Sequence, residues 1–178
     1  MSEKRGSFIT YLEDLRDRED RGALAALRRG LGQPPGSAVE MYRYVVPWLP
    51  ARATAHREAA TYLVAALFGY HPAPGGSGNL GAAFRRTLDQ QEDATAVERR
   101  FAALLAAHQD DLDFYLRQAI SYLRSKEVPV DWHQLFYDVL AWGHPDGYVQ
   151  KQWARAFWST VRRDQETATT EDGSQATP

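Results

Sequence analysis

The chain has 178 residues, no cysteine and a formal net charge of −2, with 44% hydrophobic, 25% charged and 12% aromatic residues. This composition is typical of a globular protein and excludes a disordered chain, disulfide frameworks, thiolate zinc sites and cysteine nucleophiles. No apolar run approaches the ~20 residues of a membrane span, and the start of the chain lacks the apolar core of a signal peptide. We therefore expect a cytoplasmic protein with no membrane contact.

Helical periodicity runs through the first part of the chain. Ser7 and Asp20 are the predicted N-caps of the first two helices. Apolar side chains then recur every three or four residues, a spacing typical of one helix face packed on a core. The apolar stripes of the four helices predicted here cover residues 8–15, 24–31, 39–46 and 54–68.

A Pro- and Gly-rich loop at 71–79 is the predicted boundary between two lobes, 1–70 and 80–163. Asp131 is the predicted N-cap of a helix beyond this loop. No run of alternating β-branched residues competes with helix, so we predict an all-α fold of about eight or nine helices in two packed lobes. Residues 164–178 are expected to form a disordered acidic tail. The helices predicted after the loop cover residues 80–88, 97–105, 112–123, 135–140 and 149–161.

The charges are distributed unevenly. Residues 164–178 carry four acids and no base, and without them the chain has 21 basic against 19 acidic residues. Between Arg21 and Arg86, eight arginines accompany only two acids, Glu40 and Glu58. Eighteen of the basic residues are arginine, whose planar guanidinium can bind phosphate through two hydrogen bonds. A GC-rich genome would also favour arginine and alanine codons, so both explanations stay open.

No residue pattern predicts an enzyme. The five histidines form no metal-ligand motif, and the Gly-rich loop neither follows a strand nor precedes the Lys-Ser/Thr of a phosphate loop. His71 and His144 each precede a proline at a helix end, where a capping or surface role is expected. His108 and His133, with scattered acids, are the only basis for a helical hydrolase. We predict no catalytic residue, no metal and no cofactor.

Arginines are the better candidates for a functional site. Doublets occur at 28–29, 85–86 and 99–100, and in a lysine-poor chain they favour a phosphate-binding surface over solvated helix faces. Arg43 lies between two tyrosines that could stack on bases, although we expect those tyrosines to be core. The candidate nucleic-acid-binding residues are Arg28, Arg29, Arg43, Arg52, Arg57, Arg99, Arg100 and Arg117.

Short segments in a fixed order carry a family resemblance between about residues 8 and 160. They are 23–30 (ALAALRRG), 41–47 (MYRYVVP), 79–84 (NLGAAF), 98–105 (ERRFAALL), 116–120 (LRQAI), 131–135 (DWHQL), 142–143 (WG) and 153–157 (WARAF). None is a catalytic signature. Together they resemble the CasB family, the small subunits of the Cascade surveillance complex in type I-E CRISPR systems.

The resemblance implies an all-α fold of two lobes, no enzymatic activity and a role in antiviral defence. Members of this family form a head-to-tail pair beside the subunits that hold the guide RNA. They bind nucleic acid without sequence preference and stabilise the R-loop and its displaced strand. The implied partners are other Cascade subunits, a second copy of the chain, guide RNA and target DNA. Six candidates match basic positions of the family, whereas Arg52 and Arg57 fall where the register is not fixed, and the acidic tail lies outside the pattern.

Two interpretations stay open at this point. In a helical protein–protein adaptor that binds no nucleic acid, the arginines would reflect codon bias and solvated faces. In an R-loop-stabilising subunit, phosphate contacts worth a few kcal/mol would suffice, because R-loop formation exchanges duplexes of nearly equal stability. Phosphate contacts carry no sequence information, so specificity would belong to the guide.

Overall fold

The computed structural model describes residues 7–90 and 93–171, with side chains up to residue 159, and every regular element in these ranges is helical. The prediction of an all-α fold is therefore confirmed. No helix in the described ranges is long and apolar enough to cross a membrane. The elements are α1 (Phe8–Asp17), α2 (Arg21–Arg28), the 3-10 turn η1 (Val39–Met41), α3 (Tyr42–Val45), η2 (Val46–Trp48), α4 (Ala55–Tyr70), α5 (Leu80–Leu88), α6 (Ala94–Leu105), η3 (Gln109–Asp111), α7 (Leu112–Ser125), α8 (Trp132–Ala141) and α9 (Tyr148–Glu171).

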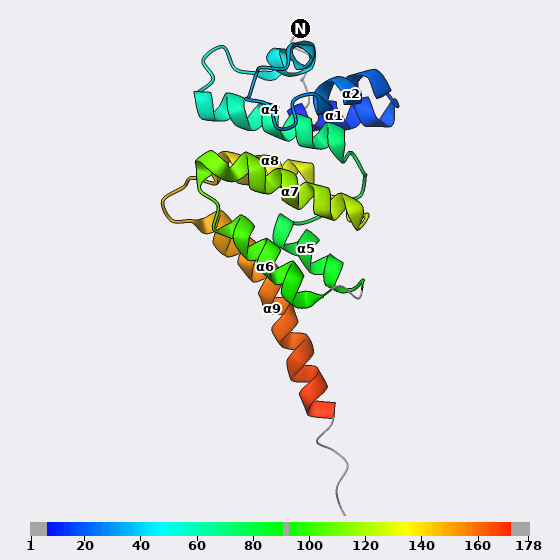
Figure 1. Cartoon of the computed structure of the whole chain (residues 1–178), viewed down its shortest axis with the longest axis vertical. Coiled ribbons are helices and arrows are strands. Elements are labelled where there is room, and N and C mark those ends of the chain that lie inside the picture. Colours follow the sequence, from blue (N-terminus) through cyan, green and yellow to red (C-terminus); the bar gives the residue numbers. More distant parts are fainter. Residues whose placement is uncertain (1–6, 91–92, 172–178) are drawn as a thin grey trace, which may run out of the picture.

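The helices lie in three tiers (Figure 1). Helices α1, α2 and α4 form the upper tier, α7 and α8 cross the middle, and α5, α6 and α9 form the lower tier. Packing is most extensive between α2 and α4 and between α5 and α9. Helix α4 also packs against α7 and α8, and α7 packs against α5 and α6. The middle tier therefore joins the parts of the chain that precede and follow the loop at 71–79.

Polar side chains cap the helix starts where the sequence predicted caps. Ser7, Asp20 and Asp131 each accept a hydrogen bond from the backbone N–H three residues later. Thr54 and Asn79 do the same at α4 and α5. These caps satisfy N–H groups that the first turn of a helix leaves without a partner.

Two elements differ from the prediction. The helix expected over 39–46 is split into η1, α3 and η2, because no side chain caps its start and Pro47 interrupts its end. A disordered tail is expected from residue 164, but α9 continues to Glu171. Residues 172–178 of the expected tail lie outside the described residues.

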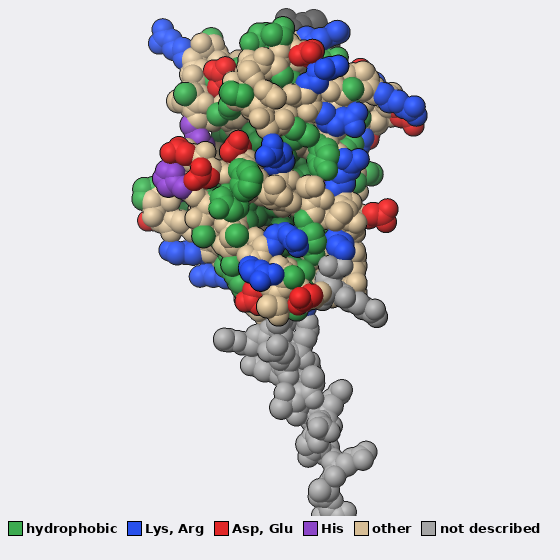
Figure 2. Space-filling model, viewed as in Figure 1, with side chains coloured by type: hydrophobic (Ala, Val, Ile, Leu, Met, Phe, Trp, Pro, Cys, Tyr) green, Lys and Arg blue, Asp and Glu red, His purple; other side chains and the backbone are tan. Residues whose placement is uncertain are grey.

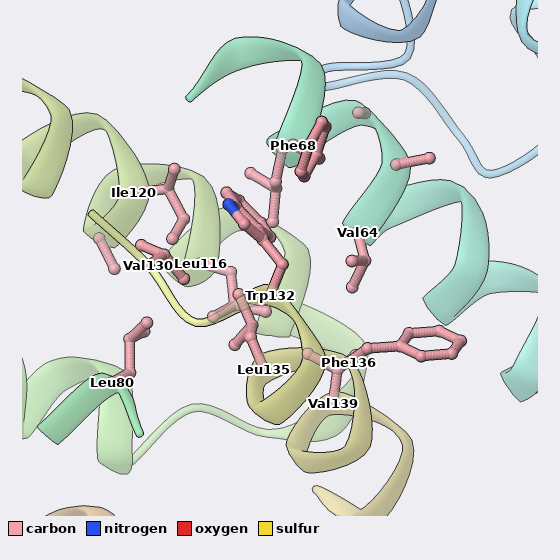
Figure 3. Close-up of a cluster of buried hydrophobic side chains, with 14 of the residues drawn as sticks. Val64, Phe68, Leu80, Leu116, Ile120, Val130, Trp132, Leu135, Phe136 and Val139 are labelled. Carbon is pink, nitrogen blue, oxygen red and sulfur yellow. The ribbon is translucent and has the colours of Figure 1, made fainter. Parts of the chain in front are cut away.

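One hydrophobic core connects the helices on both sides of the loop at 71–79. At its centre, Phe68 of α4 meets Trp132 of α8, with ring centroids 5.5 Å apart and planes at 66° (Figure 3). Leu116 and Ile120 of α7 and Leu80 of α5 are further members of this cluster. Each large apolar side chain that is fully buried contributes about 1.5–3 kcal/mol to folding. This cluster fixes α7 relative to α4 and α8.

His71 lies in this core, which corrects the expectation of a capping or surface role. Its side chain is 4% exposed, and its Nε2–H donates to the carbonyl oxygen of Val128 at 2.8 Å. The chain turns inward after α4, where a Cβ on Gly76 would lie 2.1 Å from the carbonyl carbon of Val130. Burial lowers the pKa of His71, so the stability that the neutral ring provides is lost as the pH falls below about 6.5.

Asp138 of α8 is a buried carboxyl group at the contact with α9. Its Oδ2 accepts a hydrogen bond from Nε1 of Trp153 at 2.7 Å, and its Oδ1 accepts one from Nε2 of Gln134 at 2.9 Å. Burial raises the pKa of Asp138, and the two hydrogen bonds oppose this rise. The group therefore connects two helices at an electrostatic cost when it is ionised.

We predict that Asp138→Asn makes the free energy of unfolding less dependent on pH. A raised pKa means that the contribution of Asp138 is complete below the ordinary value of 3.8 and declines as the pH rises through the raised value. Asparagine keeps both hydrogen bonds once the amide of Gln134 rotates to accept one. In urea unfolding experiments, the free energy of unfolding of the variant relative to that of the parent should be higher at pH 7.5 than at pH 4. A difference that is equal at both pH values would contradict the raised pKa.

Helices α5 and α9 approach each other closely at Gly81. A Cβ at this position would lie 2.0 Å from the carbonyl oxygen of Trp153. We predict that Gly81→Ala lowers the free energy of unfolding by about 2–3 kcal/mol, because the two helices must move apart. The matched control is Gly22→Ala in α2, where the nearest atom to a new Cβ is 3.5 Å away. Thermal melts should show a loss for the first variant only, and equal melting temperatures would contradict the tight packing.

Candidate nucleic-acid interface

Helix α7 presents a row of basic side chains beside its buried face. Its residues Leu112, Leu116, Ala119, Ile120 and Leu123 are buried, and the neighbouring face carries Arg117, Ser121 and Arg124, spaced by four and three residues. On the other flank of the exposed side of α7, Arg100 of α6 and Lys126 contact Tyr122, and Arg28 ends α2 beside the last turn of α4. We call the whole set the α7 ridge, which consists of Arg28, Arg100, Arg117, Arg124 and Lys126.

Two tyrosines support the ridge through cation–π contacts. The guanidinium carbon of Arg124 lies 4.3 Å from the ring centroid of Tyr70, and that of Arg100 lies 4.4 Å from Tyr122. The Nζ of Lys126 is 6.0 Å from the same Tyr122 ring. Such contacts contribute about 0.5–1 kcal/mol each at exposed positions. They also restrict the side chains before a ligand binds, which reduces the entropy lost on binding.

Hydrogen bonds fix the two tyrosines. The hydroxyl of Tyr70 lies 3.3 Å from Oγ of Ser121, and the hydroxyl of Tyr122 donates to Oγ1 of Thr87 at 3.1 Å. The hydrogen bond with Ser121 and the neighbouring Arg124 guanidinium lower the pKa of Tyr70. These hydrogen bonds connect Tyr70 of α4 to α7 and Tyr122 of α7 to α5, so the orientation of each ring is fixed by a second helix.

Arg117 and Arg28 extend the ridge toward the upper tier. Nη1 of Arg117 lies 2.1 Å from where a Cβ on Gly32 would be, so this glycine leaves room for the guanidinium group. Arg28 ends α2, and its backbone nitrogen lies 3.1 Å from the Cβ position of Gly69, the neighbour of Tyr70. The ridge therefore draws its cations from α2, α6 and α7.

The electrostatic surroundings leave the ridge positive. Among the described residues, no carboxylate forms an ion pair with Arg28, Arg100, Arg117 or Arg124. Figure 2 shows blue Lys and Arg side chains down the centre and right of one face, further blue side chains at its upper and lower left, and a group of red acids beside the purple histidines at its left edge. Guanidinium groups without a carboxylate partner are suited to binding phosphate oxygens.

Two of the sequence-predicted arginines have partners within the fold. Nε of Arg29 lies 3.6 Å from Oε1 of Glu40, and both side chains are largely exposed. Arg43 lies over the ring of its neighbour Tyr44, with its guanidinium carbon 5.1 Å from the centroid. The structure does not bring either side chain into the α7 ridge.

Three more predicted arginines are exposed away from the ridge contacts. Arg52 precedes α4, and Arg57 lies in its first turn, about 20 Å along the helix from Tyr70 at 1.5 Å per residue. Arg99 is exposed on α6, and about 100° of helical rotation separates it from Arg100. Only three of the eight candidates, Arg28, Arg100 and Arg117, belong to the ridge.

Sequence reasoning missed Arg124, which makes the shortest of the three cation–π contacts with Tyr70 and Tyr122. Arg124 is not part of a doublet, so a search for adjacent arginines passes over it. The available signal was its spacing of seven residues from Arg117, two turns along one helix face. The roles of Tyr70 and Tyr122 had no sequence signal, because they depend on contacts between helices.

His108 and His133 lie on different elements of the structure, at the start of η3 and in α8. Among the described residues, no three His, Asp or Glu side chains are placed to hold a metal ion. His108 lies 3.3 Å from Asp110 on the surface, whereas His133 of α8 contacts Glu13 of α1 at 3.1 Å. The two histidines considered for a hydrolase therefore have separate acidic partners on different elements.

Comparisons with known proteins find consistent matches. A family model described as CRISPR-associated protein Cse2 matches residues 23–158. A CRISPR-associated protein Cse2 from Thermus thermophilus is 34% identical over 162 residues, which cover 89% of this chain and 92% of that protein. The crystal structure of M. ruber CasB gives a TM-score of 0.75 at 28% identity, covering 90% of this chain and 95% of the other. A chain of a CRISPR RNA-guided surveillance complex, pre-nicking, gives 0.78 at 28% identity over the same shares.

We predict that Arg124→Gln raises the pKa of Tyr70. The arginine and Ser121 both stabilise the ionised phenol, so removing the positive charge shifts the pKa upward toward its ordinary value of 10.0. Tyrosine labelled with ¹³C at Cζ allows an NMR titration of this single residue, assigned with Tyr70→Phe. Arg99→Gln is the matched control and should leave the titration unchanged. An unchanged titration in Arg124→Gln would contradict the stacked arrangement.

Proposed function

Because the chain belongs to the Cse2 family, we propose that it is a non-catalytic subunit of the RNA-guided surveillance complex Cascade and binds nucleic acid through the α7 ridge. The observation that carries this proposal is the ridge itself, in which two tyrosines hold Arg124 and Arg100 and four arginines form no ion pair with a carboxylate of the described chain. In the complex, the ridge stabilises the R-loop between guide RNA and target DNA, together with the displaced strand.

The energetics of an R-loop suit a surface of this kind. The RNA–DNA hybrid that forms is about as stable as the DNA duplex that opens, so contacts worth a few kcal/mol shift the balance. Arginine contacts to phosphates release counterions and apply equally to any sequence. The guide then supplies the specificity, and the ridge supplies affinity for the opened strands.

The proposed partners are other Cascade subunits, a second copy of the chain arranged head to tail, guide RNA and target DNA, all in the cytoplasm. The family match and the similarity to a chain of a surveillance complex support this set. Within the chain, we propose the α7 ridge as the main contact. The remaining sequence-predicted residues are secondary candidates: Arg29, Arg43, Arg52, Arg57 and Arg99.

We predict weak, sequence-independent binding whose affinity falls steeply with salt and depends on the ridge. On duplex DNA, each phosphate contact contributes about 0.9 to the slope of log affinity against log salt. Arg117→Gln/Arg124→Gln should therefore reduce the slope by about two and weaken binding at low salt. Electrophoretic mobility shifts at several salt concentrations, on single- and double-stranded DNA and RNA, measure both effects.

The matched control is Arg18→Gln/Arg21→Gln, which removes the same charge at two exposed positions outside the candidate set, the C-cap of α1 and the first residue of α2. It should change the slope by less than one. If both double variants bind as well as the parent, the chain is a protein adaptor and the nucleic-acid proposal is wrong. In the assembled complex, the ridge variant should shorten the lifetime of R-loops without reducing the amount of guide RNA bound.

A further inference from the structure

A cavity of about 450 Å³ opens between the upper and middle tiers, in the size range of protein binding pockets. Its inner wall is apolar and consists of Ala59, Leu63 and Ala66 of α4 with Leu112 and Val139 of α7 and α8. The other wall is the loop from Gly30 to Ala38. Arg117 is the one residue of the proposed nucleic-acid interface that lines this cavity among the described residues.

Hydrogen bonds between different elements fix the walls of the cavity in the free chain. Nε2 of Gln109 lies 2.8 Å from Nδ1 of His56, and Nε2 of the same histidine lies 2.9 Å from the carbonyl oxygen of Leu140. These bonds connect the start of α4 to η3 and to α8. On the loop side, the hydroxyl of Tyr42 donates to the carbonyl oxygen of Gly36 at 2.6 Å. A preformed cavity loses little conformational entropy when it takes up a ligand.

The rim of the cavity is acidic. Asp110 and Asp113 line it, and Oε1 of Glu58 lies 3.8 Å from the Cβ position of Gly36 in the loop wall. Arg117 of the α7 ridge is the one arginine or lysine among the described residues that line the cavity. Figure 2 likewise shows a group of red acidic side chains beside the purple histidines at the left edge of one face. Phosphates are repelled by such a rim, whereas lysine and arginine are attracted.

An exposed aromatic side chain adjoins the cavity. The ring centroid of Phe114 lies 5.9 Å from the guanidinium carbon of Arg117, and 49% of the side chain is exposed. Aromatic side chains that are exposed on a free subunit are enriched where protein partners bind. Apolar walls, an acidic rim and an exposed ring together fit a protein segment and not a nucleic acid.

We infer that this cavity is a docking site for another protein subunit of the complex, through a segment that carries an apolar anchor flanked by lysine or arginine. The apolar side chain occupies the space along α4, and the basic side chains meet Asp110 and Asp113. This inference goes beyond the proposed nucleic-acid binding and shares with it only the membership of a multi-subunit complex. It assigns opposite ends of α7 to different kinds of partner.

Photo-cross-linking in the assembled complex tests the identity of the occupant. The cross-linking amino acid p-benzoylphenylalanine replaces Ala55, an exposed residue of the cavity lining, and in a control replaces Ala103, an exposed residue of α6. Mass spectrometry should find position 55 joined to one peptide of another subunit that contains an apolar residue next to lysine or arginine. Cross-links to nucleic acid, to a second copy of this chain or to an acidic peptide would overturn the inference. So would a yield no higher than that of the control.

Charge reversal at the rim provides an independent measurement. Asp110→Lys/Asp113→Lys should weaken at least tenfold the binding of the chain to a complex assembled without it. Asp14→Lys/Asp17→Lys on α1 makes the same change in net charge at exposed positions and should have less than a twofold effect. Binding of the free rim variant to DNA should equal or exceed that of the parent, which separates this site from the ridge. If the rim variant binds to this complex as well as the parent does, the proposal of a docking site is wrong.

Discussion

The packing of α7 against three other helices is the constraint on which the rest of the molecule depends. Its apolar face contacts α4 above and α5 and α6 below, so that little more than one side of the helix reaches solvent. Burial of this face, worth several kcal/mol over its leucines and isoleucine, fixes the rotation of the helix about its axis. Once that rotation is fixed, Arg117 and Arg124 can only point outward along one line. The position of the ridge is thus a consequence of core packing.

The same helix separates charge along its length. Acidic residues gather before and within its first turn, and basic residues follow in its second half. The helix dipole favours this order, because the N-terminus attracts negative charge and the C-terminus positive charge. Arg117 lies between the two regions and lines both the cavity and a smaller depression beside Tyr70. The order of charges that the helix dipole favours therefore places the acidic residues at the proposed protein-docking site and the basic residues at the proposed nucleic-acid interface.

The aromatic contacts and hydrogen bonds of the α7 ridge suit the proposed binding of phosphates without sequence preference. Affinity for phosphates comes from charge, and charge alone would allow long arginine side chains to move over many conformations. Tyr70 and Tyr122 reduce this freedom, because each places a cation above its ring and is itself tied to a second helix. These basic side chains therefore lose part of their conformational entropy when the protein folds, and less of it remains to be lost when phosphate binds. Under the proposed function, this restriction adds affinity for phosphates and requires no group that reads a base.

Local features of the sequence were sufficient for the helices and only partly sufficient for the interface. Capping residues such as Ser7, Asp20 and Asp131 act on backbone groups three residues away, so that their effect is visible in a short window. Doublets of arginine are visible in the same way, but adjacent residues on a helix point about 100° apart and rarely serve one surface. Arg124 was missed for this reason, and the burial of His71 was missed because a proline after a helix usually marks the surface.

By itself, the sequence determined an all-α protein with capped helices, an excess of arginine over lysine and segments in the order typical of one family. These properties depend on composition, on periodicity along one helix and on spacing along the chain. The tertiary structure alone decided which arginines share a surface, which tyrosines support them and where an acidic cavity opens. Those relations join α2, α4, α6 and α7 across as many as 96 positions, from Arg28 to Arg124. They follow from how the apolar faces pack, which no local pattern specifies.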